Sequence, residues 1–161
     1  MMSAESLSFI AALVLLPLLC VISIIDLRKM IIPDHLNFLL AMCGLAYQYA
    51  LGNDAVIQLA FAGVVLCSFW LLRAGHARLS GRIGLGMGDV KFLGAAALWV
   101  APPQLPIVLF AASVTALMFV AARIAVAGQG TMRERVPFGP FLSLGLACAW
   151  AYEQSTNLGA I

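Results

Sequence analysis

The sequence predicts an all-α integral membrane protein, a polytopic bundle of six transmembrane helices with both termini outside the cytoplasm. Composition is the first reason: of 161 residues, 63% are hydrophobic and 10% are charged, against about 45–50% and 25% in soluble domains. Long uncharged runs and a one-sided distribution of basic residues are the other two. The net charge of +2 comes without a basic stripe, so nucleic acid is not an expected partner. We expect residues 1–161 to form a single membrane-embedded domain.

The first predicted span is the uncharged run 6–25, which lies between Glu5 and Asp26. As a helix it measures about 30 Å, the thickness of the hydrocarbon core. Charged residues follow it rather than a small-residue cleavage site, so we expect a retained helix and not a signal peptide.

Further uncharged runs cover 35–53, 55–72, 92–122 and 136–152. The run 92–122 would make a helix of about 46 Å, which is too long for one crossing. Three prolines interrupt it, at Pro102, Pro103 and Pro106, and proline breaks a helix. The predicted spans are therefore approximately 6–25, 35–52, 55–72, 84–101, 105–123 and 137–153.

The positive-inside rule is an independent check on this number of spans. Six spans place the segments 26–34, 73–83 and 124–136 on one side of the membrane. All nine basic residues lie in these segments or at the adjoining helix ends: Arg28, Lys29, Arg73, Arg78, Arg82, Lys91, Arg123, Arg133 and Arg135. A five-span arrangement would separate the last two from the others, so we favour six spans with the basic side in the cytoplasm.

Two aspartates are the best indication of function. Asp26 closes the first uncharged run, and Asp89 follows Gly86, Met87 and Gly88 at the start of another apolar stretch. Charge at bilayer depth costs at least about 2.5–3.5 kcal/mol, so such residues usually line an internal cavity. If the fourth span begins near residue 82, Asp89 lies about 10 Å below the cytoplasmic interface and Asp26 lies at the inner boundary. Helix tilt or a folded-back loop would bring the two side chains face to face.

Two carboxylates that share one water can cleave an amide. The ionised one takes a proton from the attacking water, and the protonated one donates to the carbonyl oxygen and later helps the nitrogen leave. Like charge opposes double ionisation, so the pair is expected to titrate as a unit that retains one proton. Which aspartate holds that proton stays open. Neither a metal nor a cofactor is required.

Several neighbours are candidates for shaping such a site. Gly86 and Gly88 permit backbone to approach a substrate, although Gly84 and Gly88 also form a G-x-x-x-G helix-packing pattern. Lys91 lies on a different helix face from Asp89, and we expect it to reach toward the cytoplasm rather than to tune the aspartates. Asp34, after Pro33, is expected to cap the second helix.

The segment 136–141 (VPFGPF) predicts a rigid start to the last helix, because Pro137 fixes φ and Gly139 permits a close approach. His35 and His76 have no partner at metal-ligand spacing, and the four cysteines form no C-x-x-C pair. We therefore expect no metal site.

Three segments together resemble the type IV prepilin peptidase family, the membrane aspartyl proteases with a G-x-G-D signature. Residues 26–34 (DLRKMIIPD) resemble the family's first aspartate segment, 86–91 (GMGDVK) its second, and 136–142 (VPFGPFL) the P-F-G-P segment that opens the last helix. They occur in the family's order and cover nearly the whole chain. The resemblance implies that Asp26 and Asp89 are the catalytic pair.

The implied substrate is a prepilin or pseudopilin precursor, whose short basic leader is removed at the cytoplasmic face of a prokaryotic inner membrane. Longer members carry a cytoplasmic insert with paired cysteines and also methylate the new N-terminus. This chain has only a short segment there, so the resemblance implies cleavage without methylation, as in members that serve Flp-type pili.

Two other classes of function are compatible with intramembrane acids. One is a small proton- or cation-coupled transporter or channel subunit that uses the same aspartates, and the other is a scaffold subunit in which they are structural. The absence of charged residues in the middle of the other spans favours a protease site near one face over a pathway across the membrane.

Overall fold

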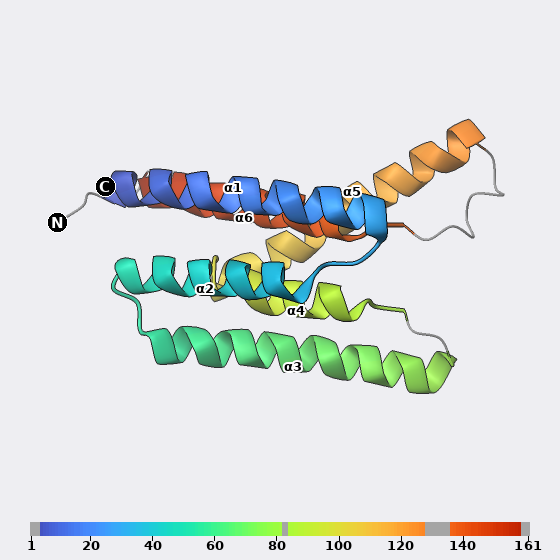
Figure 1. Ribbon diagram of the computed structural model, residues 1–161, viewed down its shortest axis with the longest axis horizontal. Helices are drawn as coiled ribbons and strands as arrows, with labels where there is room; N and C mark the ends of the chain where they lie inside the picture. The colour runs from blue at the N-terminus through green and yellow to red at the C-terminus, as the bar shows by residue number, and fades with distance from the viewer. Residues whose placement is uncertain (1–3, 82–83, 128–135, 159–161) are drawn as a thin grey trace.

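The computed structural model describes residues 4–81, 84–127 and 136–158, and all regular secondary structure within these ranges is helical (Figure 1). The elements are α1 (Ala4–Lys29), α2 (Asp34–Ala50), α3 (Ala55–Ser80), α4 (Met87–Ala96), the short 3₁₀ helix η1 (Pro102–Gln104), α5 (Leu105–Ala127) and α6 (Gly139–Leu158). The predicted all-α class is confirmed. Three stretches are long and apolar enough to cross a membrane: Ser6–Lys29, Ala55–Ser80 and Pro102–Val126.

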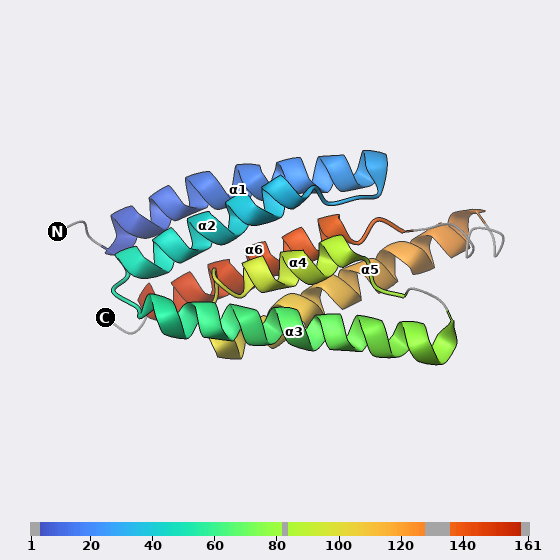
Figure 2. The ribbon, with the colours of Figure 1, turned by 60° about the horizontal axis from the view of Figure 1, so that its bottom comes forward.

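The six α-helices form an elongated bundle in which α4 is central. It packs against α2, α3 and α6, whereas α1 packs between α2 and α6, and α5 packs on α6. Neighbours along the chain run in opposite directions, so α1, α3 and α5 end at the end of the bundle where α2, α4 and α6 begin (Figures 1 and 2). We call this the aspartate end, because it holds the last turns of α1 and the first turn of α4.

The fourth helix differs most from its prediction. A span over 84–101 was expected, but α4 covers ten residues, about 15 Å. Residues 97–100 of the predicted span form a turn instead of a helix, and every residue from 92 to 100 is buried. Non-helical backbone at membrane depth is stable where protein surrounds it. Trp99, which is 1% exposed, secures the turn by donating from Nε1 to the Leu40 carbonyl at 2.8 Å.

The third helix is longer than predicted. A loop was expected from residue 73, but α3 continues to Ser80, and Arg73 and Arg78 therefore lie on the helix. Gly81 ends it in the left-handed conformation (φ 64°), and its N–H bonds to the Ala77 carbonyl, as is common at helix C-termini. The break at Pro102 and Pro103 is confirmed, since η1 separates α4 from α5.

The outward faces of the long helices are apolar. Large exposed side chains include Phe9 on α1, Val56 on α3 and Phe110 and Leu117 on α5. A continuous apolar exterior is uncommon in soluble monomers but suits hydrocarbon. The chain thus has the features of a multi-pass membrane protein.

Candidate active site

Asp26 and Asp89 line one cavity of about 840 Å³ at the aspartate end. Its walls come from the end of α1 and the α1–α2 connector, the glycine-rich segment before α4, and the segment before α6. The lining residues are Asp26, Met30, Ile31, Ile32, Gly84, Leu85, Gly86, Met87, Gly88, Asp89, Val136, Pro137 and Phe138. The cavity is therefore mainly apolar, with two carboxylates among its walls.

The Asp26 carboxylate is held by a contact with the start of α6. Its side chain is 4% exposed, and its Oδ2 accepts a hydrogen bond from the Gly139 N–H at 2.7 Å. Gly139 is the first residue of α6, where backbone N–H groups lack partners within the helix. A Cβ added at Gly139 would lie 2.8 Å from Asp26 Oδ2 and 2.9 Å from Asp26 Cβ, so only glycine fits this approach.

Asp89 is held by the start of its own helix. It is the third residue of α4, and its carboxylate accepts a hydrogen bond from the N–H of Gly86, the N-cap residue. This is the return half of a capping box, in which an acidic residue at the third position satisfies the N-cap amide. The positive end of the helix dipole also favours a carboxylate there. Asp89 and Asp26 are close enough for their charges to repel each other.

Each of the three glycines in this segment has a different close neighbour. An added Cβ would lie 2.9 Å from the His76 ring at Gly84, 2.8 Å from Asp89 Oδ2 at Gly86, and 3.1 Å from Ile32 Cβ at Gly88. Gly84 precedes α4, so Gly84 and Gly88 do not share one helix face, as the alternative G-x-x-x-G packing would require. The glycines instead let three separate groups approach the same short stretch of backbone.

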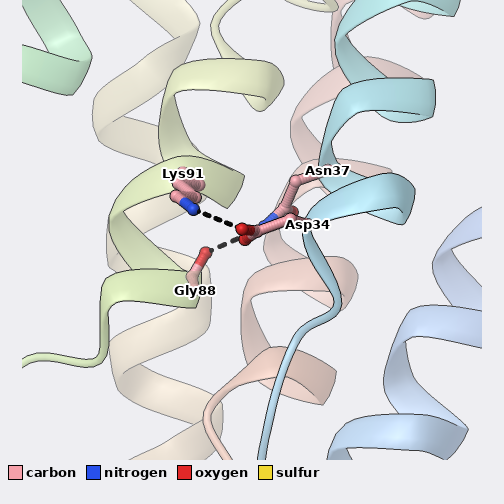
Figure 3. Close-up of polar contacts among 4 residues, drawn as sticks. All are labelled: Asp34, Asn37, Gly88 and Lys91. Atoms are coloured by element: carbon pink, nitrogen blue, oxygen red, sulfur yellow. Dashed lines mark hydrogen bonds and ion pairs between the residues drawn. The ribbon is translucent and has the colours of Figure 1, made fainter.

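Lys91 and Asp34 form an ion pair between α4 and α2, with Lys91 Nζ 2.7 Å from Asp34 Oδ2 (Figure 3). The expectation that Asp34 caps α2 is wrong: the N-cap is Pro33, no side chain caps the helix, and Asp34 is its first residue. Lys91 reaches across to the neighbouring helix instead of only toward the cytoplasm. Pro33 does not line the cavity, but it follows the lining residue Ile32 and starts α2.

Two positioning contacts were not predicted from the sequence. Asn37 Nδ2 donates to the Gly88 carbonyl at 3.2 Å, and Arg73 Nε donates to the Leu85 carbonyl at 2.9 Å. The sequence signal available for Asn37 was an amide side chain near the start of an apolar run. Arg73 was assigned to a loop, and only its place on α3 shows that it faces the glycine-rich segment.

Among the residues that the structure describes, no three His, Cys, Asp or Glu side chains gather at metal-ligand distances. The chemistry available in the cavity is that of two carboxylates beside an apolar surface. Arg82, Arg133 and Arg135, which were placed at this end from the sequence, lie outside the described residues.

The fold and the cavity define a class of protein: a helical membrane protein with an aspartate pair at one end of its bundle. The type IV leader peptidase family matches residues 13–121, a range that includes both aspartates, and the chain belongs to this family. The resemblance inferred from the three motifs is thereby confirmed.

Individual relatives agree with this assignment. The chain is 35% identical over 147 residues to a prepilin leader peptidase/N-methyltransferase of Aeromonas salmonicida, covering 88% of this chain and 49% of the relative. For the protein of that name in Escherichia coli K12 the identity is 33% over 132 residues, covering 77% and 55%. Leader peptidase HopD of Escherichia coli is 28% identical over 127 residues, covering 78% and 82%. The chain thus spans about half the length of the first two, and no solved structure matches it.

Proposed function

We propose that this chain is an aspartic-type endopeptidase that removes the leader from prepilin or prepilin-like precursors. The observation that carries the proposal is that Asp26 and Asp89 line the same cavity. Family membership supplies the class of reaction, and the names of the relatives supply the class of substrate. The alternative of a transporter or channel subunit finds no support in the family match or in these names.

The proposed reaction uses one water and no cofactor. One aspartate, ionised, takes a proton from the water as its oxygen attacks the scissile carbonyl carbon. The other, protonated, donates to the carbonyl oxygen. The C–N bond then breaks: the first aspartate passes its proton to the leaving nitrogen, and the second aspartate regains a proton from a hydroxyl of the intermediate, which releases the new amine and a carboxylic acid. Repulsion between two carboxylates that line one cavity favours the singly protonated pair that this reaction requires.

The apolar walls of the cavity suit the part of the substrate beyond the leader. Met30, Ile31 and Met87 line the cavity and are exposed, and methionine adapts its shape to apolar partners. We expect the start of the substrate's apolar helix to rest here, with the scissile bond over the aspartates. Gly86, Gly88, Lys91, Pro33, Pro137 and Gly139 shape the site around them.

We further propose six membrane crossings, with the aspartate end in the cytoplasm and both termini outside. The six basic residues that the structure describes all lie toward the aspartate end: Arg28, Lys29, Arg73, Arg78, Lys91 and Arg123. The acidic Asp54 and Glu153 lie toward the opposite end. This asymmetry follows the positive-inside rule for a bacterial inner membrane protein. In this arrangement α4 completes its crossing through the turn at 97–100 and η1.

Leader cleavage in a purified system tests the proposal. We expect the chain in liposomes to convert a prepilin precursor into two fragments, seen by mass spectrometry as a gain of one water across them. A precursor that already lacks its leader is the control and should stay unchanged. If the precursor remains intact while the same liposomes dissipate a proton or cation gradient, the peptidase proposal is wrong and the transporter reading replaces it.

The same experiment tests the proposal that this chain cleaves without methylating. In the presence of S-adenosylmethionine, we expect the new N-terminal residue to keep its unmodified mass. Leader peptidase HopD, of which this chain matches 82%, carries a name without a methyltransferase part. A mass gain of one methyl group at that residue would contradict this part of the proposal.

Gly86→Ala is expected to lower the cleavage rate by about tenfold, because reacting groups displaced by about 1 Å lose up to 10²-fold in rate. The Gly86 backbone (φ −65°) accommodates alanine, but the new Cβ would lie 2.8 Å from Asp89 Oδ2 and displace the carboxylate. Gly75→Ala is the matched control, since its Cβ meets nothing within 4 Å. An unchanged rate for Gly86→Ala, measured with saturating precursor, would show that the position of this oxygen does not matter.

A further inference from the structure

The first turn of α4 is tied to α2 by two side-chain contacts, the Asn37–Gly88 hydrogen bond and the Lys91–Asp34 ion pair (Figure 3). The two differ in their surroundings. The Lys91 and Asp34 side chains are 35% and 73% exposed, and water weakens an exposed ion pair. Asn37 is 4% exposed, and a buried amide that loses its hydrogen-bond partner has no water to replace it. Asn37 is therefore the stronger constraint.

The carbonyl that Asn37 binds belongs to the peptide unit between Gly88 and Asp89. That unit is planar, so a hydrogen bond to its oxygen also fixes the backbone nitrogen of Asp89. Gly88 packs on the backbone of Ile32, where an added Cβ would lie 3.4 Å from both the nitrogen and the oxygen of Ile32. The backbone that carries Asp89 is thus held from the side by the α1–α2 connector.

The same connector follows the last turn of α1, which carries Asp26. The Met30 N–H bonds to the Asp26 carbonyl at 2.8 Å, and α2 starts at Asp34 after Pro33. A short, bonded stretch of chain therefore leads from one aspartate to the residue that holds the backbone of the other. The separation of the two carboxylates depends on this stretch and on the Asn37 contact at its far end.

We propose that Asn37 is a positioning residue that sets Asp89 against Asp26 for peptide cleavage, an inference that rests on the proposed function. Asn37 acts through the Gly88 carbonyl and not on the substrate. Its Oδ1 has no hydrogen-bond partner among the described residues. For packing alone, a leucine, whose side chain has the same number of heavy atoms and the same branching, would serve at least as well in this apolar setting.

Kinetics separate positioning from packing. We expect Asn37→Leu to lower kcat for leader cleavage by about 10- to 100-fold, with KM changed less than twofold and no loss of thermal stability. Gln48→Leu is the matched control: Gln48 is a buried amide on the same helix, 3% exposed, but it bonds Asn53 at the opposite end. Its kcat should stay within twofold of the parent. A parallel loss of stability and activity in both variants, or an unchanged kcat for Asn37→Leu, would overturn the proposal.

A second measurement does not depend on catalysis. In a chain whose native cysteines are replaced, Asp26→Cys and Asp89→Cys are joined by bifunctional thiol reagents of graded length. Adding Asn37→Leu should lower the yield with the best reagent at least threefold, whereas adding Gln48→Leu should not. An unaltered yield contradicts the positioning role, even if the parent cleaves prepilin. A reduced yield in a parent that cleaves nothing supports the positioning role and shows that the proposed function alone is wrong.

Discussion

Replacing either Asp26 or Asp89 with asparagine is expected to lower leader cleavage by about 10²–10⁴-fold, the range that acid and base groups contribute. The two carboxylates have different tasks at any moment, one accepting a proton and one donating, and an amide performs neither. Asparagine has nearly the same shape, and its oxygen can still accept the hydrogen bond that Gly139 donates to Asp26 Oδ2. The loss should therefore appear in cleavage rates, measured by mass spectrometry, and not in membrane insertion.

Asp54→Asn is the matched control for this pair. Asp54 caps α3 by accepting from the N–H groups of Val56 and Ile57, and asparagine caps helices about as well. The control should cleave at the parent rate. If a correctly inserted Asp26→Asn or Asp89→Asn protein removes the leader as fast as the control, the aspartate pair is not catalytic.

Gly139→Ala is expected to reduce cleavage by about 10²-fold, since a 1 Å misplacement of a reacting group is enough for such a loss. The added Cβ would approach three atoms of Asp26, Oδ2 at 2.8 Å, Cβ at 2.9 Å and Cγ at 3.0 Å. Rotation of the carboxylate relieves the contact with Oδ2 but not the one with Cβ, which is attached to the backbone of α1. The ends of α1 and α6 must separate, so we also expect a lower melting temperature than for Gly86→Ala.

Gly63→Ala controls for the general effect of alanine in place of a helical glycine. Gly63 lies within α3, and a Cβ there meets nothing within 4 Å. This variant should melt no lower than the parent, because alanine stabilises a helix interior by about 1 kcal/mol relative to glycine. Full activity in Gly139→Ala would show that the contact between α6 and Asp26 has no role in cleavage.

The helices were predictable because the membrane imposes long uncharged runs, and the break at Pro102 followed from helix length. Two boundaries were not predictable from these rules. Helix α4 begins at Met87, after the glycine-rich segment, and not at residue 84. It ends at Ala96 and not at residue 101, because neighbouring helices bury residues 92–100 and so allow a turn there. Hydropathy reports the environment of a segment and not its backbone, so a buried turn and a helix look alike.

The site residues that could be predicted from the sequence are those whose charge is costly in an apolar chain or whose backbone conformation is unusual. Charge within an apolar chain marked Asp26 and Asp89, and the PFGP segment marked Gly139. The partners of these residues were not predictable, because Asn37 and Arg73 donate to backbone carbonyls on α4 and in the segment before it. Such contacts depend on how α2 and α3 pack against α4, which no spacing along the chain records.

The close approaches at Gly84, Gly86 and Gly88 divide the segment before Asp89 into two kinds of position. A side chain at Gly84 or Gly86 would displace His76 or Asp89, and one at Gly88 would press on Ile32, while Leu85 and Met87 between them line the cavity. Variation in what the proposed peptidase accepts is therefore expected at Leu85 and Met87, whereas a substitution at Gly84, Gly86 or Gly88 would also displace one of those three neighbours.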